Sequence, residues 1–267
     1  MVPATASVVW SDGQLHLGDV ADELEVDLGL LLGMSPVVHV ERGLLAREHA
    51  QVLCEAAALL GYEGLSPGRV EDAVRELPVP AAAVVVVPTA EHHRATPAGT
   101  SWRLVELPPR AESVGDVDLV VSPLPRSGLP EVASLVLWDD TELAAAAAVH
   151  PDGVRPGVDS LLRLDGNGHV ARAGDAALVA RVGGELLTPR LADGAPRTAW
   201  RHVLLDGVHE TSLAVDLLTT ATSIALLGPA GSVRAVRSLD ARPLAELDLA
   251  DEQRARLDVV RDREARP

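Results

Sequence analysis

The chain has 267 residues, of which 47% are hydrophobic, and its formal net charge is −16. This length suffices for one large or two medium domains with a sizeable core. Nucleic acids and anionic membrane surfaces bind basic patches, so the negative charge argues against both partners. No apolar run reaches the roughly 20 residues that a membrane helix needs. We therefore expect no nucleic-acid and no membrane partner.

Cysteine usage and the first residues bear on localisation. Cys54 is the only cysteine, which excludes an internal disulfide and fits a reducing compartment. The first ten residues show no basic start followed by a long apolar stretch, so no signal peptide is expected. We predict a cytoplasmic protein in which Cys54, placed in an apolar helical run, acts as a small buried hydrophobe rather than as a reactive thiol.

The basic residues have an unusual composition. All 23 of them are arginine, and the chain contains no lysine. A guanidinium stays protonated at any workable pH and is a poor nucleophile. Chemistry that needs a Schiff base on a side-chain amine is therefore excluded.

The first half of the chain alternates short strands and helices. Residues 6–10 and 14–17 flank Ser11-Asp12-Gly13 and predict a hairpin. Ser66 and Pro67 are a typical helix start. Periodicity predicts helices over 47–61 and 66–77 and strands over 81–88, 101–107 and 116–122. The adjacent pair His92-His93 has no third ligand at a supporting spacing, so no metal site is predicted.

A domain boundary is predicted at residues 123–130 (PLPRSGLP), which are rich in Pro, Gly and Ser. This linker separates a smaller N-terminal domain, 1–122, from a larger C-terminal domain, 131–267. The alanine-rich segment 141–149 predicts a helix early in the second domain.

The stretch 159–191 lies at the centre of the second domain. It contains three strand-like runs separated by Gly166-Asn167-Gly168 and by Gly183-Gly184. Both turns consist of residue types that tolerate positive φ, as tight hairpins require. The stretch therefore predicts antiparallel hairpins. A charged, solvated helix is expected near the end of the chain, over 252–263.

Three segments around this centre carry a family resemblance. Residues 27–33 (DLGLLLG) are similar to an Asp-Arg-Gly-Leu-Leu-Tyr-Gly motif, and 194–201 (GAPRTAWR) to Gly-Ile-Leu-Pro-Gly-Ile-Thr-Arg. Residues 221–240 align without gaps on a third motif of the same proteins. The chain resembles the class IV aminotransferases, the branched-chain aminotransferase and aminodeoxychorismate lyase group. The resemblance implies a two-domain α/β (α+β) fold, a barrel-like β core in the larger domain, pyridoxal phosphate (PLP) as cofactor, and a homodimer.

The chemical positions of that family are altered here. The Schiff-base lysine falls near Trp138, and the glutamate that pairs with the PLP ring nitrogen falls on Arg172. In the first domain the family's histidine matches His49, but the arginine that clamps the cofactor phosphate is Val52.

The phosphate-contacting positions of the second domain differ too: they fall on Thr198, Trp200 and Pro229. Each lost charge-assisted contact costs roughly 1.5–3 kcal/mol. We therefore predict no catalytic residue and no bound cofactor, and a non-catalytic homologue of the family.

Two alternative functions remain open. Because both include a possible reaction, the sequence does not decide whether the chain is an enzyme. In the first, the interdomain cleft binds a small carboxylate or phosphate, or supports a PLP-independent reaction, through the candidate anion-binding residues Arg126, Arg172, Arg197 and Arg201. Surface pairing of these arginines with the plentiful acids is the simpler explanation for each one. In the second, the chain is an aminotransferase or lyase that binds PLP in an atypical mode.

Overall fold

The structure is a computed structural model of the whole chain and describes residues 8–11, 14–17, 37–40, 44–59, 65–76, 82–88, 102–107, 115–122 and 160–264. The chain forms two compact units. Unit 1 comprises Met1–Ala111 and Val136–Trp138, and unit 2 comprises Glu112–Leu135 and Asp139–Pro267. The predicted linker 123–130, the helix 141–149, the 27–33 motif and the His92-His93 pair lie outside the described residues.

Unit 1 contains an antiparallel sheet with the strand order β2-β1-β5-β4-β3. Its strands are β1 (Val8–Ser11), β2 (Gln14–Leu17), β3 (Val37–Val40), β4 (Ala82–Pro88) and β5 (Trp102–Leu107). The predicted hairpin is confirmed, because β1 pairs with β2 from Val8 opposite Leu17 to Ser11 opposite Gln14.

Two helices of unit 1 contribute to its core: α2 (Ala46–Leu59) and α3 (Pro67–Glu76), both close to their predicted bounds. The core cluster includes Leu53 of α2 and Val70 of α3. Cys54 is half-buried beside this cluster, and burial, with a smaller effect of the Glu55 carboxylate, raises the pKa of its thiol to about 11. The thiol is protonated at neutral pH, which agrees with the predicted lack of reactivity, but the side chain is half-buried and not buried as predicted.

Unit 2 is built on a large mixed sheet with the strand order β11-β10-β9-β12-β13-β6-β7-β8, and β14 pairs with β13. Its strands are β6 (Val117–Val121), β7 (Ser160–Leu164), β8 (Val170–Ala173), β9 (Ala177–Val182), β10 (Glu185–Pro189), β11 (His209–Thr211), β12 (Ser223–Leu227), β13 (Val233–Leu239) and β14 (Arg242–Pro243). The predicted boundary puts the β6 segment in the N-terminal domain. In the structure β6 lies between β13 and β7, parallel to both, and belongs to unit 2.

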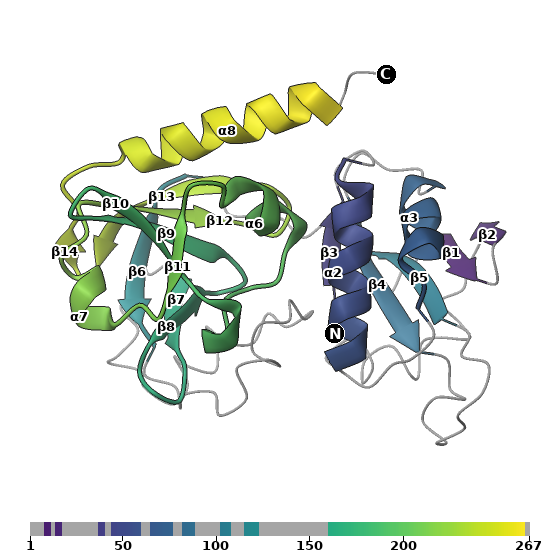
Figure 1. The fold of residues 1–267 in the computed structure, drawn as a ribbon, viewed down its shortest axis with the longest axis horizontal. Coiled ribbons are helices and arrows are strands. Elements are labelled where there is room, and N and C mark those ends of the chain that lie inside the picture. The colour runs from purple at the N-terminus through teal and green to yellow at the C-terminus, as the bar shows by residue number, and fades with distance from the viewer. Residues whose placement is uncertain are drawn as a thin grey trace. The chain divides into compact units, whose positions relative to one another are not determined.

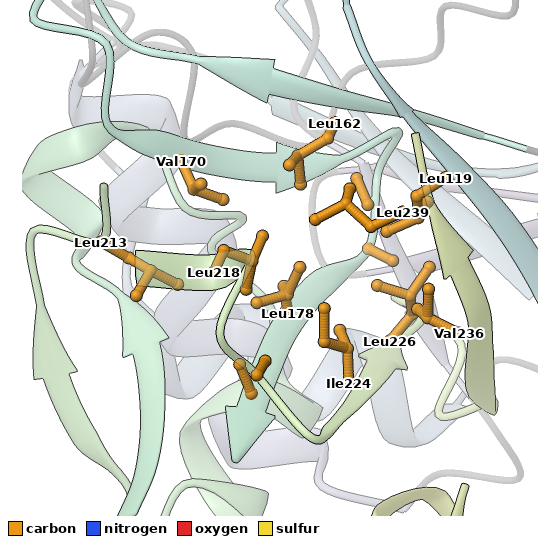
Figure 2. Close-up of a cluster of buried hydrophobic side chains, with 14 of the residues drawn as sticks. Leu119, Leu162, Val170, Leu178, Leu213, Leu218, Ile224, Leu226, Val236 and Leu239 are labelled. Atoms are coloured by element: carbon orange, nitrogen blue, oxygen red, sulfur yellow. The ribbon is translucent and has the colours of Figure 1, made fainter. Parts of the chain in front are cut away.

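The sheet of unit 2 closes into a barrel. Beyond β11 the chain returns to β8: the Val170 N–H donates to the Leu213 carbonyl at 2.7 Å, and His169 forms a bridge with Ala214. Leu178, Ile224 and Leu226 point into the barrel together with leucines and valines of the other strands (Figure 2). This interior is the core of unit 2, as the predicted barrel-like β core requires.

The central hairpins contain one more strand than predicted. The pattern of residues 169–182 predicts a single run, but Gly174 and Asp175 turn the chain between β8 and β9. Gly174 has φ +58°, and Ala173 and Ala176 exchange backbone hydrogen bonds of 3.1 and 3.0 Å. The turn is hidden in the sequence because alanines flank it directly on both sides and only one glycine marks it.

Helical segments surround the barrel. They are the 3-10 helix η2 (Leu191–Asp193), α6 (Ala199–Leu204), α7 (Val215–Leu218) and α8 (Asp248–Glu264). Helix α8, yellow in Figure 1, lies along the outside of the barrel and contacts β12 and β13. It is charged as predicted but begins four residues earlier and buries Leu249, Ala250, Gln253 and Leu257. None of the described helices combines the length and apolar character that a membrane span requires.

Candidate functional site

The start of α6 and the turn between β12 and β13 are the two described segments of unit 2 that carry the predicted phosphate positions. Helix α6 begins at Ala199, because Thr198 is its N-cap. The Thr198 hydroxyl accepts a hydrogen bond from the Arg201 N–H at 3.0 Å. At this position Thr198 stabilises the helix end, as N-cap threonines do.

Trp200 joins α6 to the turn. Its side chain is fully buried, and it lies against Gly231 so closely that a Cβ atom on Gly231 would be 2.7 Å from Cε2 of the indole. Gly231 has φ +82°, a conformation that favours glycine. The guanidinium of Arg261 in α8 lies 5.8 Å from the centre of the indole ring, within range of a cation–π interaction. The indole therefore packs between the start of α6 and the β12–β13 turn.

The turn itself uses its amides internally. The Gly228 N–H donates to the Ser232 carbonyl at 2.9 Å, and the Gly231 N–H donates to the Gly228 carbonyl at 3.0 Å. Pro229 has no N–H to donate. Three positions of this turn thus offer no amide hydrogen to an anion.

Arg201, a candidate anion ligand, is a buried structural residue with 4% of its surface exposed. One terminal nitrogen donates to the Pro189 carbonyl at 2.7 Å, and the other donates to the Glu210 carboxylate at 3.3 Å. Burial lowers the pKa of Arg201, while Glu210 opposes that shift and the charge of Arg197 adds to it. The two terminal nitrogens therefore hold α6 to the end of β10 and to β11.

The other sequence-predicted residues occupy different places. Arg197 is half-buried and close enough to Arg201 for their charges to interact. Arg172 is half-buried in β8 and lies opposite Arg163 of β7. Arg126 and Trp138 lie outside the described residues. The structure thus brings Arg197 and Arg201 together.

In unit 1, the two family-matched positions lie on α2. Val52 is buried with 8% of its surface exposed and belongs to the apolar core. His49, one turn earlier, is 1% exposed. Position 52 therefore contributes packing, and it offers no cation to a phosphate.

A polar cluster that the sequence analysis missed lies at the β7–β8 turn. One ligand atom from each of Asp165, His169 and Asp193 lies within 4.8 Å of the others. Asp165 accepts hydrogen bonds from the backbone N–H groups of His169 (2.7 Å) and Asn167 (2.9 Å). Burial raises the pKa of Asp165, but these hydrogen bonds and the His169 ring outweigh it and lower the pKa overall. An Asp before Gly-Asn-Gly is the available sequence signal, because aspartate caps such turns.

Arg190 completes this cluster. Its guanidinium donates twice to the Asp193 carboxylate, at 3.2 and 3.0 Å, and also contacts the Ser212 hydroxyl. Arg190 also interacts electrostatically with Asp165. Asp193 is thus already paired with Arg190, and Asp165 with His169 and two backbone amides, so the cluster supports the β7–β8 turn rather than a metal ion.

Comparison with known proteins places this fold. No protein-family model and no curated protein sequence matches the chain. Among solved structures, the branched-chain amino acid aminotransferase of Escherichia coli matches with a TM-score of 0.68 at 18% identity, over 94% of this chain and 92% of that one. The Thermobaculum terrenum enzyme in its PLP form matches with a TM-score of 0.71 at 14% identity, over 97% of this chain and 94% of that one. The chain has the branched-chain aminotransferase fold.

A third aminotransferase of this fold extends the comparison to archaea. The branched-chain aminotransferase of Thermoproteus uzoniensis, solved with norvaline, matches with a TM-score of 0.71 at 16% identity, over 96% of this chain and 94% of that one. The predicted two-domain α/β architecture is thereby confirmed over nearly the full length. At this identity the likeness establishes the aminotransferase fold and not an activity.

Proposed function

We propose that this chain is a non-catalytic homologue of the class IV aminotransferases that no longer holds PLP. One observation carries the proposal: the buried indole of Trp200 lies against Gly231, between the helix start and the turn where the family resemblance expects the cofactor phosphate. A bulky side chain packed to van der Waals contact leaves no volume for a phosphate group.

The remaining residues of this region agree with the proposal. Pro229 lacks an N–H, and the amides of Gly228 and Gly231 donate to carbonyls of their own turn. With no lysine anywhere in the chain, no side-chain amine is available for a covalent bond to an aldehyde. The residues present therefore do not fit PLP, and we propose no reaction through it. We further propose a cytoplasmic homodimer.

An absorbance experiment tests the loss of the cofactor. Purified protein is incubated with PLP, dialysed, and scanned for the Schiff-base band. We expect no Schiff-base band in the dialysed protein, because the chain has no lysine. A band that survives dialysis would contradict the proposal and support the alternative, an aminotransferase or lyase with atypical PLP binding.

A variant separates the missing amine from the filled phosphate region. Trp138→Lys supplies an amine near the position where the family resemblance expects the lysine. We expect this single variant still not to retain PLP, because Trp200 remains in place. Retention by Trp138→Lys alone would mean that the lysine was the only part lost and that the phosphate region is intact.

A second function, binding of a small carboxylate or phosphate, is favoured by one observation. Arg197 lies near Arg201 in unit 2, and the two like charges interact unfavourably. An anion bound near the half-buried Arg197 would reduce that repulsion while Arg201 keeps its contacts to Pro189 and Glu210. Thermal-shift measurements with inorganic phosphate, acetate and succinate test this function, since a ligand at 100 times its Kd adds about 2.7 kcal/mol of stability. The shift should vanish in Arg197→Gln, and no shift in the wild type would exclude these anions as ligands.

A further inference from the structure

The C-terminal helix α8 has little apolar anchoring for its length. It spans 17 residues, and its buried side chains are Leu249, Ala250, Gln253 and Leu257. Only two of the four are large and apolar. The helix lies on the outside of the barrel along β12 and β13 (Figure 1). Its apolar contribution to docking is therefore small compared with that of the barrel interior.

One of those buried side chains opposes docking. Gln253 is fully buried, and among the described residues neither its amide nitrogen nor its amide oxygen has a hydrogen-bond partner. On undocking, both atoms gain hydrogen bonds to water. A buried polar group without a partner loses its hydration without compensation. Gln253 thus weakens the docked state of α8.

Ionic contacts hold the beginning of the helix. Arg181 of β9 donates to Asp248 at 2.8 Å and to Glu252 at 2.6 Å, and Glu246 lies 3.8 Å away. The side chains of Asp248 and Glu252 are 55% and 47% exposed. Salt screens contacts between such exposed charges. The attachment at Arg181 therefore depends on ionic strength.

Arginines of α8 attach the rest of the helix. Arg254 donates to the Val233 carbonyl at 3.2 Å, and Arg256 donates to the Asp206 carbonyl at 2.8 Å. Near the end of the helix, Arg261 lies over the ring of Trp200. These contacts are polar and lie at the surface or partly buried, where water replaces them readily.

We propose that α8 is a latch, defined as residues 248–264, that undocks as one unit while the barrel stays folded. Its undocking removes Arg261 from the indole of Trp200 and exposes the outward faces of β12 and β13. The latch is a conformational device of this chain, independent of whether the proposed loss of PLP holds. The unpaired Gln253 amide weakens the docking of α8, and the ionic contacts of Arg181 make that docking sensitive to salt.

Hydrogen–deuterium exchange of the full chain tests the latch. We expect the α8 amides to exchange at least about tenfold faster than those of β12, since partial unfolding has a lower free energy than global unfolding. The α8 rate should rise further between about 0.05 M and 1 M NaCl, where the Debye length falls to about 3 Å. If α8 and β12 exchange at the same rate with the same denaturant dependence, the helix belongs to the cooperative unit of the barrel and the proposal fails.

Variants assign the two contributions. Gln253→Leu should slow α8 exchange by about tenfold, because the unpaired amide is removed. Arg181→Met should accelerate α8 exchange and reduce its salt dependence, whereas Arg242→Met, at an exposed arginine of β14, should leave both unchanged. Faster α8 exchange in Gln253→Leu would overturn the role of Gln253, since it would show that the amide is satisfied in the docked state.

Native-state proteolysis gives an independent measurement. Trypsin cleaves after arginine, and α8 contains Arg254, Arg256, Arg261 and Arg263. We expect cleavage within α8 while the barrel stays intact, at a rate that rises with NaCl and falls in Gln253→Leu. If α8 were cleaved only when the barrel is cleaved as well, undocking of α8 as a separate unit would be contradicted.

Discussion

The indole of Trp200 and the backbone of Gly231 lie so close together that position 231 does not accommodate a side chain. Gly231→Ala would place a Cβ atom 2.7 Å from Cε2 of Trp200 on a residue with φ +82°. Backbone strain costs about 1–2 kcal/mol, and overpacking costs about 1–3 kcal/mol more. We expect chemical denaturation of Gly231→Ala to show a loss of stability equal to the sum of these two costs.

A matched control separates them. Gly207 also has a positive φ, +76°, but an added Cβ there meets nothing within 4 Å. Gly207→Ala should therefore show only the backbone cost of about 1–2 kcal/mol. Equal losses in the two variants would mean that the indole moves aside without cost, which would weaken the case that Trp200 is tightly packed.

Arg201 gives a second prediction, because its guanidinium bonds Pro189 and Glu210 from a buried position. Arg201→Met should destabilise the protein by about 2–4 kcal/mol, since it leaves the Pro189 carbonyl without this donor and removes a buried charge-assisted contact. Glu210→Gln should cost less than about 1 kcal/mol, because the Glu210 side chain is 45% exposed. Urea denaturation of both variants measures the difference. If Arg201→Met left the free energy of unfolding unchanged, Arg201 would not be a structural residue.

Local chemistry explains which elements the sequence predicted. The β7–β8 and β9–β10 hairpins were predicted from Gly166-Asn167-Gly168 and Gly183-Gly184, and the structure has φ +86° at Gly168 and +58° and +90° at Gly183 and Gly184. The turn at Gly174 has no such signal, since the mostly apolar residues on both sides resemble one long buried strand.

Contacts between distant segments account for the rest. Strand β6 pairs with β13, whose residues lie more than a hundred positions later, so no local pattern assigns β6 to the second unit. Closure of the barrel through Val170 and Leu213 is likewise a property of the folded sheet. At the candidate site, the sequence supplied the charge of Arg201 but not its burial, and burial is what makes it a structural residue.

The Asp165 carboxylate should make stability depend on pH. Hydrogen bonds and the His169 ring lower its pKa below the ordinary value of 3.8 in spite of burial. A lowered folded-state pKa stabilises the protein above the unfolded-state value and loses that contribution as the pH falls through the folded-state value. The stability difference between wild type and Asp165→Asn should thus be largest near pH 6 and should shrink below about pH 4.

Urea denaturation of both proteins across this range measures the effect, with Asp262→Asn, an exposed position of α8, as control. A stability difference that stays constant from pH 6 to the acid limit would mean that the Asp165 charge contributes nothing and that only the geometry of the turn matters.

The β13–β14 turn offers a stabilising substitution. Ala241 has φ +63° and its neighbour Asp240 has φ +48°, so both adopt a left-handed conformation without being glycine. Relief of that strain gains about 1–2 kcal/mol, while the flexibility of glycine in the unfolded chain costs about 0.5–1 kcal/mol. Ala241→Gly should therefore stabilise the protein by about 0.5–1 kcal/mol.

The same change at Asp240 should bring no gain, because the Asp240 carboxylate accepts the Val121 N–H at 2.9 Å and that bond, worth about 1 kcal/mol, would be lost. Thermal unfolding of the two variants distinguishes the positions, and an equal gain at both would show that the bond to Val121 does not stabilise the turn.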